Sequence, residues 1–141
     1  MRFWDSSAIV PVIMAELRSA ELRTHADDGN DVVAWWGTIV ECTSAIARRE
    51  RTGAISSDDA SSAFETLDRI ADGWTQIPPG DDLRDGARRL VRIHDLRAAD
   101  ALQLSAARIA SDGRPDTLPF VTLDDRLALA ARREGFPVLP G

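Results

Sequence analysis

Short apolar runs alternate with stretches of helical periodicity along the chain. The runs are bounded by Gly, Pro or Asp and predict strands at residues 2–4, 31–35, 74–77, 118–122 and 137–139. Helices are predicted between them at about residues 7–16, 17–26, 38–52, 57–72, 82–94, 98–111 and 124–133. Glycines follow four of these helices as C-terminal caps, and Ser56 to Asp59 resembles a capping box. This alternation predicts an α/β fold with a short, mostly parallel sheet covered by helices on both faces.

Length and composition indicate one compact domain over residues 1–141. The chain is 44% hydrophobic and 28% charged, and it is long enough to bury a core without disulfides or metals. Cys42 is the only cysteine and the two histidines are far apart, so neither an internal disulfide nor a Cys/His zinc site is expected. The apolar run at residues 8–15 is short and interrupted by Pro11, unlike a signal peptide or a membrane span. We therefore expect a cytoplasmic protein without membrane attachment.

The absence of lysine excludes several classes of enzyme. All 17 basic residues are arginine, whereas P-loop NTPases, Schiff-base enzymes, protein kinases and response-regulator receivers need a lysine amine. Tyrosine is also absent, and two isolated histidines argue against a histidine-driven hydrolase. A net charge of -6 argues against nucleic-acid binding through a bulk positive field, although local arginine patches or bound cations could still support it. Carboxylates are the abundant reactive groups that remain.

Two acids directly follow predicted strands. Asp5 comes after the first strand and Asp124 after the fourth, and parallel sheets bind ligands beyond the carboxyl ends of their strands. Asp5 is either a ligand or the N-cap of the helix that follows it. At the later strand, Thr122-x-x-Asp125 fits a capping box with Thr122 as the N-cap. In that interpretation Asp125 is structural and Asp124 is free for chemistry.

Two further acids lie on predicted helices. The segment 98–110 is polar only at positions 100, 103, 105 and 108, so this helix is expected to be buried nearly all round. Asp100 enters the interior there and needs a partner, which is either Arg97 in an ion pair or a metal ion. Glu41 lies at the rim of the apolar arc of the 38–52 helix and, taken alone, is interpreted as a solvated surface glutamate.

Four segments of the chain together resemble the PIN-domain family. They are Asp5-Ser-Ser-Ala, Val-Glu41-Cys-Thr-Ser-Ala-Ile-Ala-Arg, Leu96-Arg-Ala-Ala-Asp100-Ala-Leu-Gln-Leu-Ser-Ala-Ala and Val121-Thr-Leu-Asp124-Asp-Arg-Leu-Ala-Leu-Ala-Ala. Each segment alone is common, but all four occur in order and at suitable spacing, so the resemblance covers nearly the whole chain. Within the family, the match is closest to VapC-type toxins of bacterial toxin–antitoxin pairs.

The resemblance implies a PIN-like three-layer α/β/α sandwich with metal-dependent endoribonuclease activity. It implies that the acidic metal-binding and catalytic residues are Asp5, Glu41, Asp100 and Asp124. The implied substrate is cellular RNA (tRNA, rRNA or mRNA), and the implied partner is a VapB-type antitoxin. Such an antitoxin would lay a helix in a groove between the 7–26 helices and the 38–52 helix and reach the acids with an arginine. We also expect a homodimer, the commonest closed oligomer.

Charge repulsion within such a cluster favours a bound cation. Two carboxylates about 4 Å apart repel by about 4 kcal/mol at an effective dielectric of about 20, so the cluster must take up protons or recruit cations. Mg²⁺ or Mn²⁺ suits oxygen ligands better than zinc does, and would activate a water for attack on a phosphodiester. Asp5 and Asp100 are the expected central ligands, with Glu41 and Asp124 flanking them.

Smaller side chains and arginines near the motifs have two interpretations each. The hydroxyls that orient ligands or water, or else cap helices, are those of Ser6, Ser7 and Thr122. The arginines that contact RNA phosphates, or else form a solvated, salt-bridged face, are Arg48, Arg97 and Arg126. Trp4 replaces the small aliphatic residue expected before the first acid, and is most simply explained by core packing.

Two other functions remain open at this point. The chain could be an inactive binding module whose acid cluster holds one structural cation. Trp35 and Trp36 are adjacent, so one of them must face outward, where it could anchor a partner. A haloacid-dehalogenase-type phosphatase also uses an aspartate after its first strand. Its D-x-D-x-[TV] run requires an acid where this chain has Ser7, and it requires a lysine.

Overall fold

The structure, a computed structural model, describes residues 1–17 and 31–141. Its strands are β1 (Arg2–Trp4), β2 (Val32–Trp35), β3 (Thr75–Ile77), β4 (Phe120–Val121) and β5 (Val138–Leu139). Its helices are α1 (Ser6–Glu16), α3 (Thr38–Arg51), α4 (Ser57–Ala71), α5 (Asp81–Ile93), α6 (Ala98–Ala110) and α7 (Asp125–Arg133), with a short 3-10 helix at Pro115–Thr117. Each predicted strand and helix within the described residues is present. The helix predicted at residues 17–26 lies outside them, apart from Leu17.

β1 lies at the centre of a five-stranded sheet whose order is β3-β2-β1-β4-β5. All its pairings are parallel, and Phe3 lies opposite both Val33 of β2 and Phe120 of β4. The sheet expected to be mostly parallel is therefore wholly parallel in the described part of the chain. The chain places β2 and β3 on one side of β1 and β4 and β5 on the other, so the strand order reverses beside β1. Such a reversal opens a crevice at the carboxyl ends of the strands.

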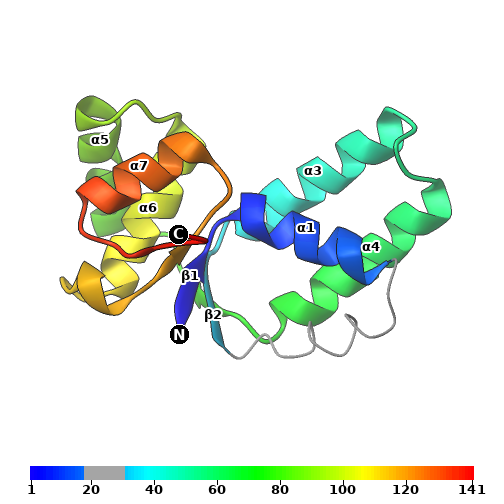
Figure 1. Ribbon diagram of the computed structural model, residues 1–141, viewed down its shortest axis with the longest axis horizontal. Helices are drawn as coiled ribbons and strands as arrows, with labels where there is room; N and C mark the ends of the chain where they lie inside the picture. The colour runs from blue at the N-terminus through cyan, green and yellow to red at the C-terminus, as the bar shows by residue number, and fades with distance from the viewer. Residues whose placement is uncertain (18–30) are drawn as a thin grey trace.

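Helices cover both faces of the sheet (Figure 1). Residues of α1, α3 and α4 form one apolar cluster that includes Ile13 and Ala34. Residues of α5, α6 and α7 form the other, which includes Phe3 and Val33. Successive side chains of a strand point to opposite faces, so the neighbours Val33 and Ala34 of β2 join different clusters. The result is the predicted three-layer α/β/α arrangement.

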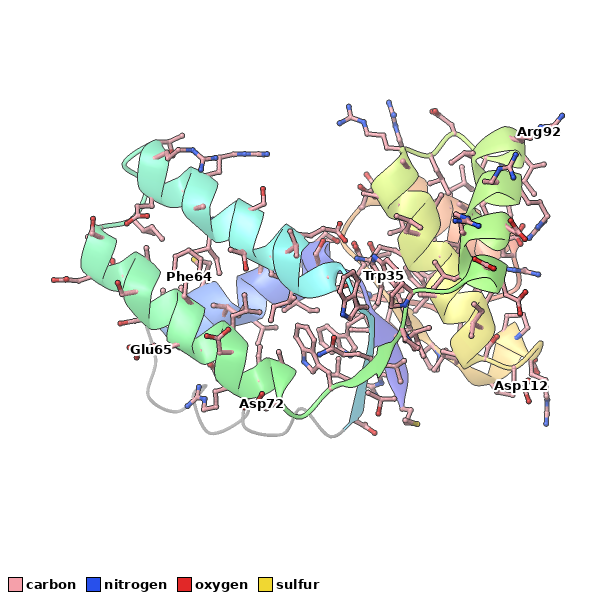
Figure 2. All side chains as sticks on the ribbon, turned by 180° about the vertical axis from the view of Figure 1, so that it is seen from behind. Trp35, Phe64, Glu65, Asp72, Arg92 and Asp112 are labelled. Carbon is pink, nitrogen blue, oxygen red and sulfur yellow. The ribbon has the colours of Figure 1, made fainter. Side chains whose placement is uncertain are left out.

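The tryptophans of the sheet are divided between core and surface. Trp35 is 8% exposed, belongs to the cluster under α5 and α6, and lies near the middle of the molecule (Figure 2). Trp36 is 56% exposed, and its ring meets that of Trp35 edge-on. Trp4 packs against the cluster under α1, α3 and α4. The core position of Trp4 and the opposite orientations of the adjacent pair were both predicted from the sequence.

Most helix ends agree with the local sequence signals, although Gly73 after α4 does not adopt the positive φ of a glycine cap. The Ser56 hydroxyl accepts a hydrogen bond from the Asp59 amide at 3.0 Å and caps α4, as predicted. Gly53, Gly113 and Gly135 adopt positive φ after α3, α6 and α7, where other residues would be strained. Within residues 1–17 and 31–141, no helix is long and apolar enough to cross a membrane.

Candidate functional site

Asp5 connects β1 to α1 at the strand reversal. Its amide donates to the Val121 carbonyl at 3.0 Å, so the residue continues the pairing of β1 with β4. Its carboxylate caps α1 by accepting from the Ser7 amide, and Oδ2 also accepts from the hydroxyls of Ser7 and Thr122 at 2.5 Å and 2.9 Å. The side chain is only 3% exposed. Burial raises the pKa of Asp5 above its ordinary value, against the opposing effect of these hydrogen bonds.

Hydroxyl groups join the beginning of α1 to the end of β4. Ser7 Oγ accepts from the Leu123 amide at 2.9 Å, and it lies 3.1 Å from Thr122 Oγ1. Thr122 Oγ1 in turn accepts from the Asp124 amide at 3.0 Å. Both hydroxyls therefore contact the buried Asp5 carboxylate while fixing the loop that carries Asp124. The positions of Ser7 and Thr122 agree with an orienting role, and Ser6 also lies within reach of Asp5 at 3.4 Å.

The cap of α7 differs from the sequence prediction. The N-cap is Asp124, whose Oδ1 accepts from the Leu127 amide at 3.0 Å. The predicted capping box, with Thr122 as the N-cap and a structural Asp125, is therefore wrong. Thr122 uses its hydroxyl on Asp5 instead, so the helix begins two residues later than a Thr122 cap requires. Asp125 is exposed, whereas Asp124 is half-buried and combines a cap with its place near the other acids.

Glu41 occupies the first turn of α3, which begins after Gly37. A Cβ at Gly37 would come within 2.5 Å of the Trp35 indole nitrogen, so the chain needs glycine where β2 turns into the helix. Glu41 is half-buried, and its Oε2 accepts from Gln103 Nε2 at 2.7 Å. Its interpretation as a solvated surface glutamate is therefore wrong. Burial, together with the charges of Asp5 and Asp100, raises its pKa from 4.5 to about 7.

Asp100 lies in the first turn of α6 and is half-buried. Burial and the charges of Asp124 and Asp5 raise its pKa, against a backbone hydrogen bond from Arg97 and the Arg97 charge. Among the described residues, the ion pairs do not include one between Asp100 and Arg97. The first of the two partners considered for Asp100, an Arg97 ion pair, is thus not formed. The helix around it is buried on most sides, with a buried stretch from Gln103 to Ala107.

An open cavity of about 680 Å³ brings several predicted residues together. The acids that line it include Glu41, Asp100 and Asp124, and the arginines that line it are Arg48, Arg97 and Arg126. Asp5 does not line the cavity, but it is near enough that its charge affects the pKa values of Glu41 and Asp100. The three arginines singled out in the sequence therefore share one hollow with the acids, although they come from α3, the α5–α6 connection and α7.

The donor set of this hollow suits a hard divalent cation. It consists of carboxylate oxygens with hydroxyls around them, and no ion pair within residues 1–17 and 31–141 engages any of the four acids. In the same residues, no three acidic, histidine or cysteine side chains are already gathered closely enough to hold one ion. Mg²⁺ commonly binds through one or two carboxylates and keeps several waters, so the residues present fit such an ion.

Known structures provide an independent comparison. The crystal structure of PAE2754 from Pyrobaculum aerophilum has a TM-score of 0.66 and 18% identity, over 98% of this chain and 88% of that one. The crystal structure of FitAcB from Neisseria gonorrhoeae has a TM-score of 0.63 and 17% identity, over 98% and 96%. The chain has a PIN-like fold. No protein-family model matches the sequence, and no curated protein matches it either.

Sequence reasoning missed one residue of the site, Gln103. It is fully buried and donates to both Glu41 and Thr38. The sequence offered one sign of it: Gln103 is an isolated amide one helical turn after Asp100, on a face of the helix that is otherwise apolar there. Without the partner helix in view, that amide could not be assigned a contact.

Proposed function

We propose that this protein is a Mg²⁺- or Mn²⁺-dependent endoribonuclease of VapC type, the toxin of a toxin–antitoxin pair. The observation that carries the proposal is the cavity in which Glu41, Asp100 and Asp124 meet three arginines. Three of the acids around it, Asp5 included, have raised pKa values and no ion-pair partner in the described part of the chain. Perturbed carboxylates in a cleft are typical of functional sites rather than of structural ion pairs.

The chain's residues divide the work of such a site. Asp5 and Asp100 are proposed as the central ligands, with Glu41 and Asp124 beside them. Ser7 and Thr122 hold the Asp5 carboxylate through short hydrogen bonds, which fixes its orientation. Arg48, Arg97 and Arg126 can pair with phosphate oxygens of RNA through their guanidinium groups, which supplies local positive charge in a protein of net charge -6. When bound, the ion supplies an activated water and neutralises charge on the leaving oxygen.

The toxin part of the proposal rests on the four acidic motifs and on the fold shared with PAE2754 and FitAcB. A nuclease with an open carboxylate site would damage its own cell, so we propose a VapB-type antitoxin as the partner that covers the hollow. A homodimer is proposed as well. Growth of a bacterial host should stop when this chain is expressed alone and continue with Asp5→Asn.

Metal-dependent cleavage is the direct test. Purified protein is incubated with single-stranded and structured RNA in Mg²⁺, in Mn²⁺ and in excess chelator. Cleavage is expected only with a divalent cation, and Asp5→Asn purified in parallel should be inactive, which excludes a contaminating ribonuclease. Equal cleavage in chelator would contradict the metal mechanism. If wild type neither cleaves RNA nor arrests growth at high expression, the inactive binding module becomes the better function.

A further inference from the structure

Gln103 links two of the proposed ligand-bearing helices across the carboxyl edge of the sheet. It lies on α6, one helical turn after Asp100, and is 0% exposed. Its Nε2 donates to Glu41 Oε2 at 2.7 Å and to Thr38 Oγ1 at 2.9 Å, and both acceptors belong to α3 on the opposite helical layer. The amide therefore spans from the helix of one acid to the carboxylate of another.

The orientation of this amide is determined by its neighbours. Both Nε2 hydrogens are used, one on each acceptor. Rotating the amide by half a turn would place Gln103 Oε1 against the Glu41 carboxylate, which offers no donor when ionised. Within the described residues, the Glu41 side chain accepts one other hydrogen bond, which is longer, at 3.4 Å from Ser6 Oγ. The hydrogen bond from Gln103 is thus the shorter of the two that restrain the flexible Glu41 carboxylate.

The Gln103 amide also lowers the stability of the fold, because one of its polar atoms is buried without a hydrogen bond. Gln103 Oε1 is buried, and no hydrogen-bond partner for it exists within the described residues. Buried polar atoms are nearly always paired, so each exception calls for an explanation. An apolar side chain of similar size would fill this place without the unpaired oxygen. The unpaired oxygen is explained if the opposite end of the amide has a functional task.

We propose that Gln103 is a positioning residue that holds the Glu41 carboxylate toward the cavity as a ligand for the divalent cation. This inference rests on the proposed function and adds to it the residue that orients one ligand. Groups that hydrogen-bond to metal ligands usually change metal affinity tenfold to a hundredfold when they are removed. Gln103 should therefore act on metal binding through Glu41, without contacting the ion or the RNA itself.

The test measures Mn²⁺ binding to the RNA-free protein by titration calorimetry. Gln103→Met keeps the length of the side chain but has no donor, and should weaken Mn²⁺ binding by about tenfold. Ser105→Ala is the matched control, because it removes another buried hydrogen bond of α6, 2.6 Å to the Leu83 carbonyl, with no contact to Glu41. Its Mn²⁺ affinity should remain within about twofold of wild type. Circular dichroism melts establish that each variant is folded. If Gln103→Met does not fold, Thr38→Val, which removes the second anchor of the amide, should give a smaller loss in the same direction.

A second arm tests whether the effect passes through Glu41. In the Glu41→Gln background, Gln103→Met should cause no further loss of Mn²⁺ affinity. Wild-type affinity in folded Gln103→Met, or an equal loss in both backgrounds, would overturn the inference while leaving the metal site intact. Wild type that binds Mn²⁺ no better than Asp5→Asn would instead overturn the proposed function, and the inference with it.

Discussion

Glu134 and the acids at the edge of the sheet are carboxylates with different partners. Glu134, just after α7, has a side chain that is 9% exposed and lies against two arginines and a histidine: Arg89 at 2.5 Å, Arg108 at 2.6 Å and His94 Nε2 at 2.8 Å. Although burial alone raises it, the pKa of Glu134 is held below its ordinary value by the hydrogen bonds from His94 and Arg89 and by the charges of Arg89 and Arg108. Asp5 is similarly buried, at 3%, yet receives only neutral hydrogen bonds, and its pKa is raised.

The difference separates a structural carboxylate from candidate chemical ones. Glu134 ties α5, α6 and α7 together, because Arg89 and Arg108 belong to the first two helices and Glu134 ends the third. Its charge is compensated within the protein. The acids at the edge of the sheet form no ion pair within the described residues, which costs stability in the free protein but leaves their oxygens available to a cation from solution. Burial of a carboxylate alone therefore does not indicate a functional site, whereas burial without an ion pair favours one.

Neutralising one acid at the edge of the sheet should have the largest effect and tests most directly whether these acids differ from Glu134. Asp100→Asn should reduce RNA cleavage by at least about a hundredfold, since losing even an outer partner of a ligand costs tenfold to a hundredfold. Its melting temperature in chelator at pH 7 should equal or exceed that of wild type, because one of several repelling charges is gone. Cleavage assays and thermal melts on the same preparation check both halves. An active Asp100→Asn would remove this residue from the proposed ligand set.

Neutralising Glu134 should have the opposite profile. Glu134→Gln leaves Arg89 and Arg108 without a carboxylate, and should lower the free energy of unfolding by about 1.5 kcal/mol. This loss of unfolding free energy is small for hydrogen bonds between charged groups, because the two arginines are 45% and 41% exposed and water can solvate them. Cleavage per folded molecule should be retained. Urea denaturation measures the stability, and a variant as stable as wild type would show that the network contributes nothing.

The two groups should also respond to pH with opposite signs. In chelator, the folded protein binds the Glu41 proton more tightly than the unfolded chain does, so this residue lowers stability progressively as pH rises from 4.5 to about 7. Glu134 contributes stability above 4.5 that is lost as the pH falls through its lowered folded-state pKa. Thermal melts across this range should show a smaller upper decline in Glu41→Gln, because Asp5 and Asp100 also have raised pKa values, and a decline that is largely lost in Mg²⁺. An upper decline unchanged in Glu41→Gln would assign it to other groups.

The smallest expected effect concerns the two aspartates at the start of α7. Asp124→Ala removes the helix cap and should cost about 1 kcal/mol in unfolding free energy, together with a loss of cleavage. Asp125→Ala should change stability by less than about 0.5 kcal/mol and keep cleavage, because Asp125 is exposed. Denaturant midpoints and RNA cleavage rates, measured for both variants, show which of the two aspartates caps α7. The reverse result would restore the capping box that the sequence favoured.

Much of the fold follows from local pattern. Strand and helix positions, the Ser56 cap and the division of Trp35 and Trp36 depend on periodicity and on residues close in sequence, so the sequence alone predicts them. The acids and arginines around the cavity could likewise be named from motifs, and the parallel sheet brings the strand-end acids to one edge.

What the sequence could not predict depends on contacts between distant segments. The local sequence favoured a helix cap for the hydroxyl of Thr122, but this hydroxyl donates to the Asp5 carboxylate, 117 residues away. Glu41 looked like a surface residue because only α3 was in view, and its partner Gln103 is 62 residues later. In both cases the local interpretation failed because a partner distant in sequence determines the contact: Asp5 beside the neighbouring strand for Thr122, and Gln103 of the opposite helical layer for Glu41.

The hydrogen bonds that join Ser7 and Asp5 to Thr122 also set when this site can exist during synthesis. They connect positions 115 and 117 residues apart, near opposite ends of the chain. A ribosome-bound chain that has not yet released β4 has neither the second hydroxyl that holds Asp5 nor the Asp124 carboxylate. The acids at the sheet edge are therefore assembled only after residues 120–124 have been synthesised. A nascent or truncated chain that ends before residue 120 carries Asp5, Glu41 and Asp100 but lacks Thr122 and Asp124, so the arrangement of acids seen here is incomplete in it.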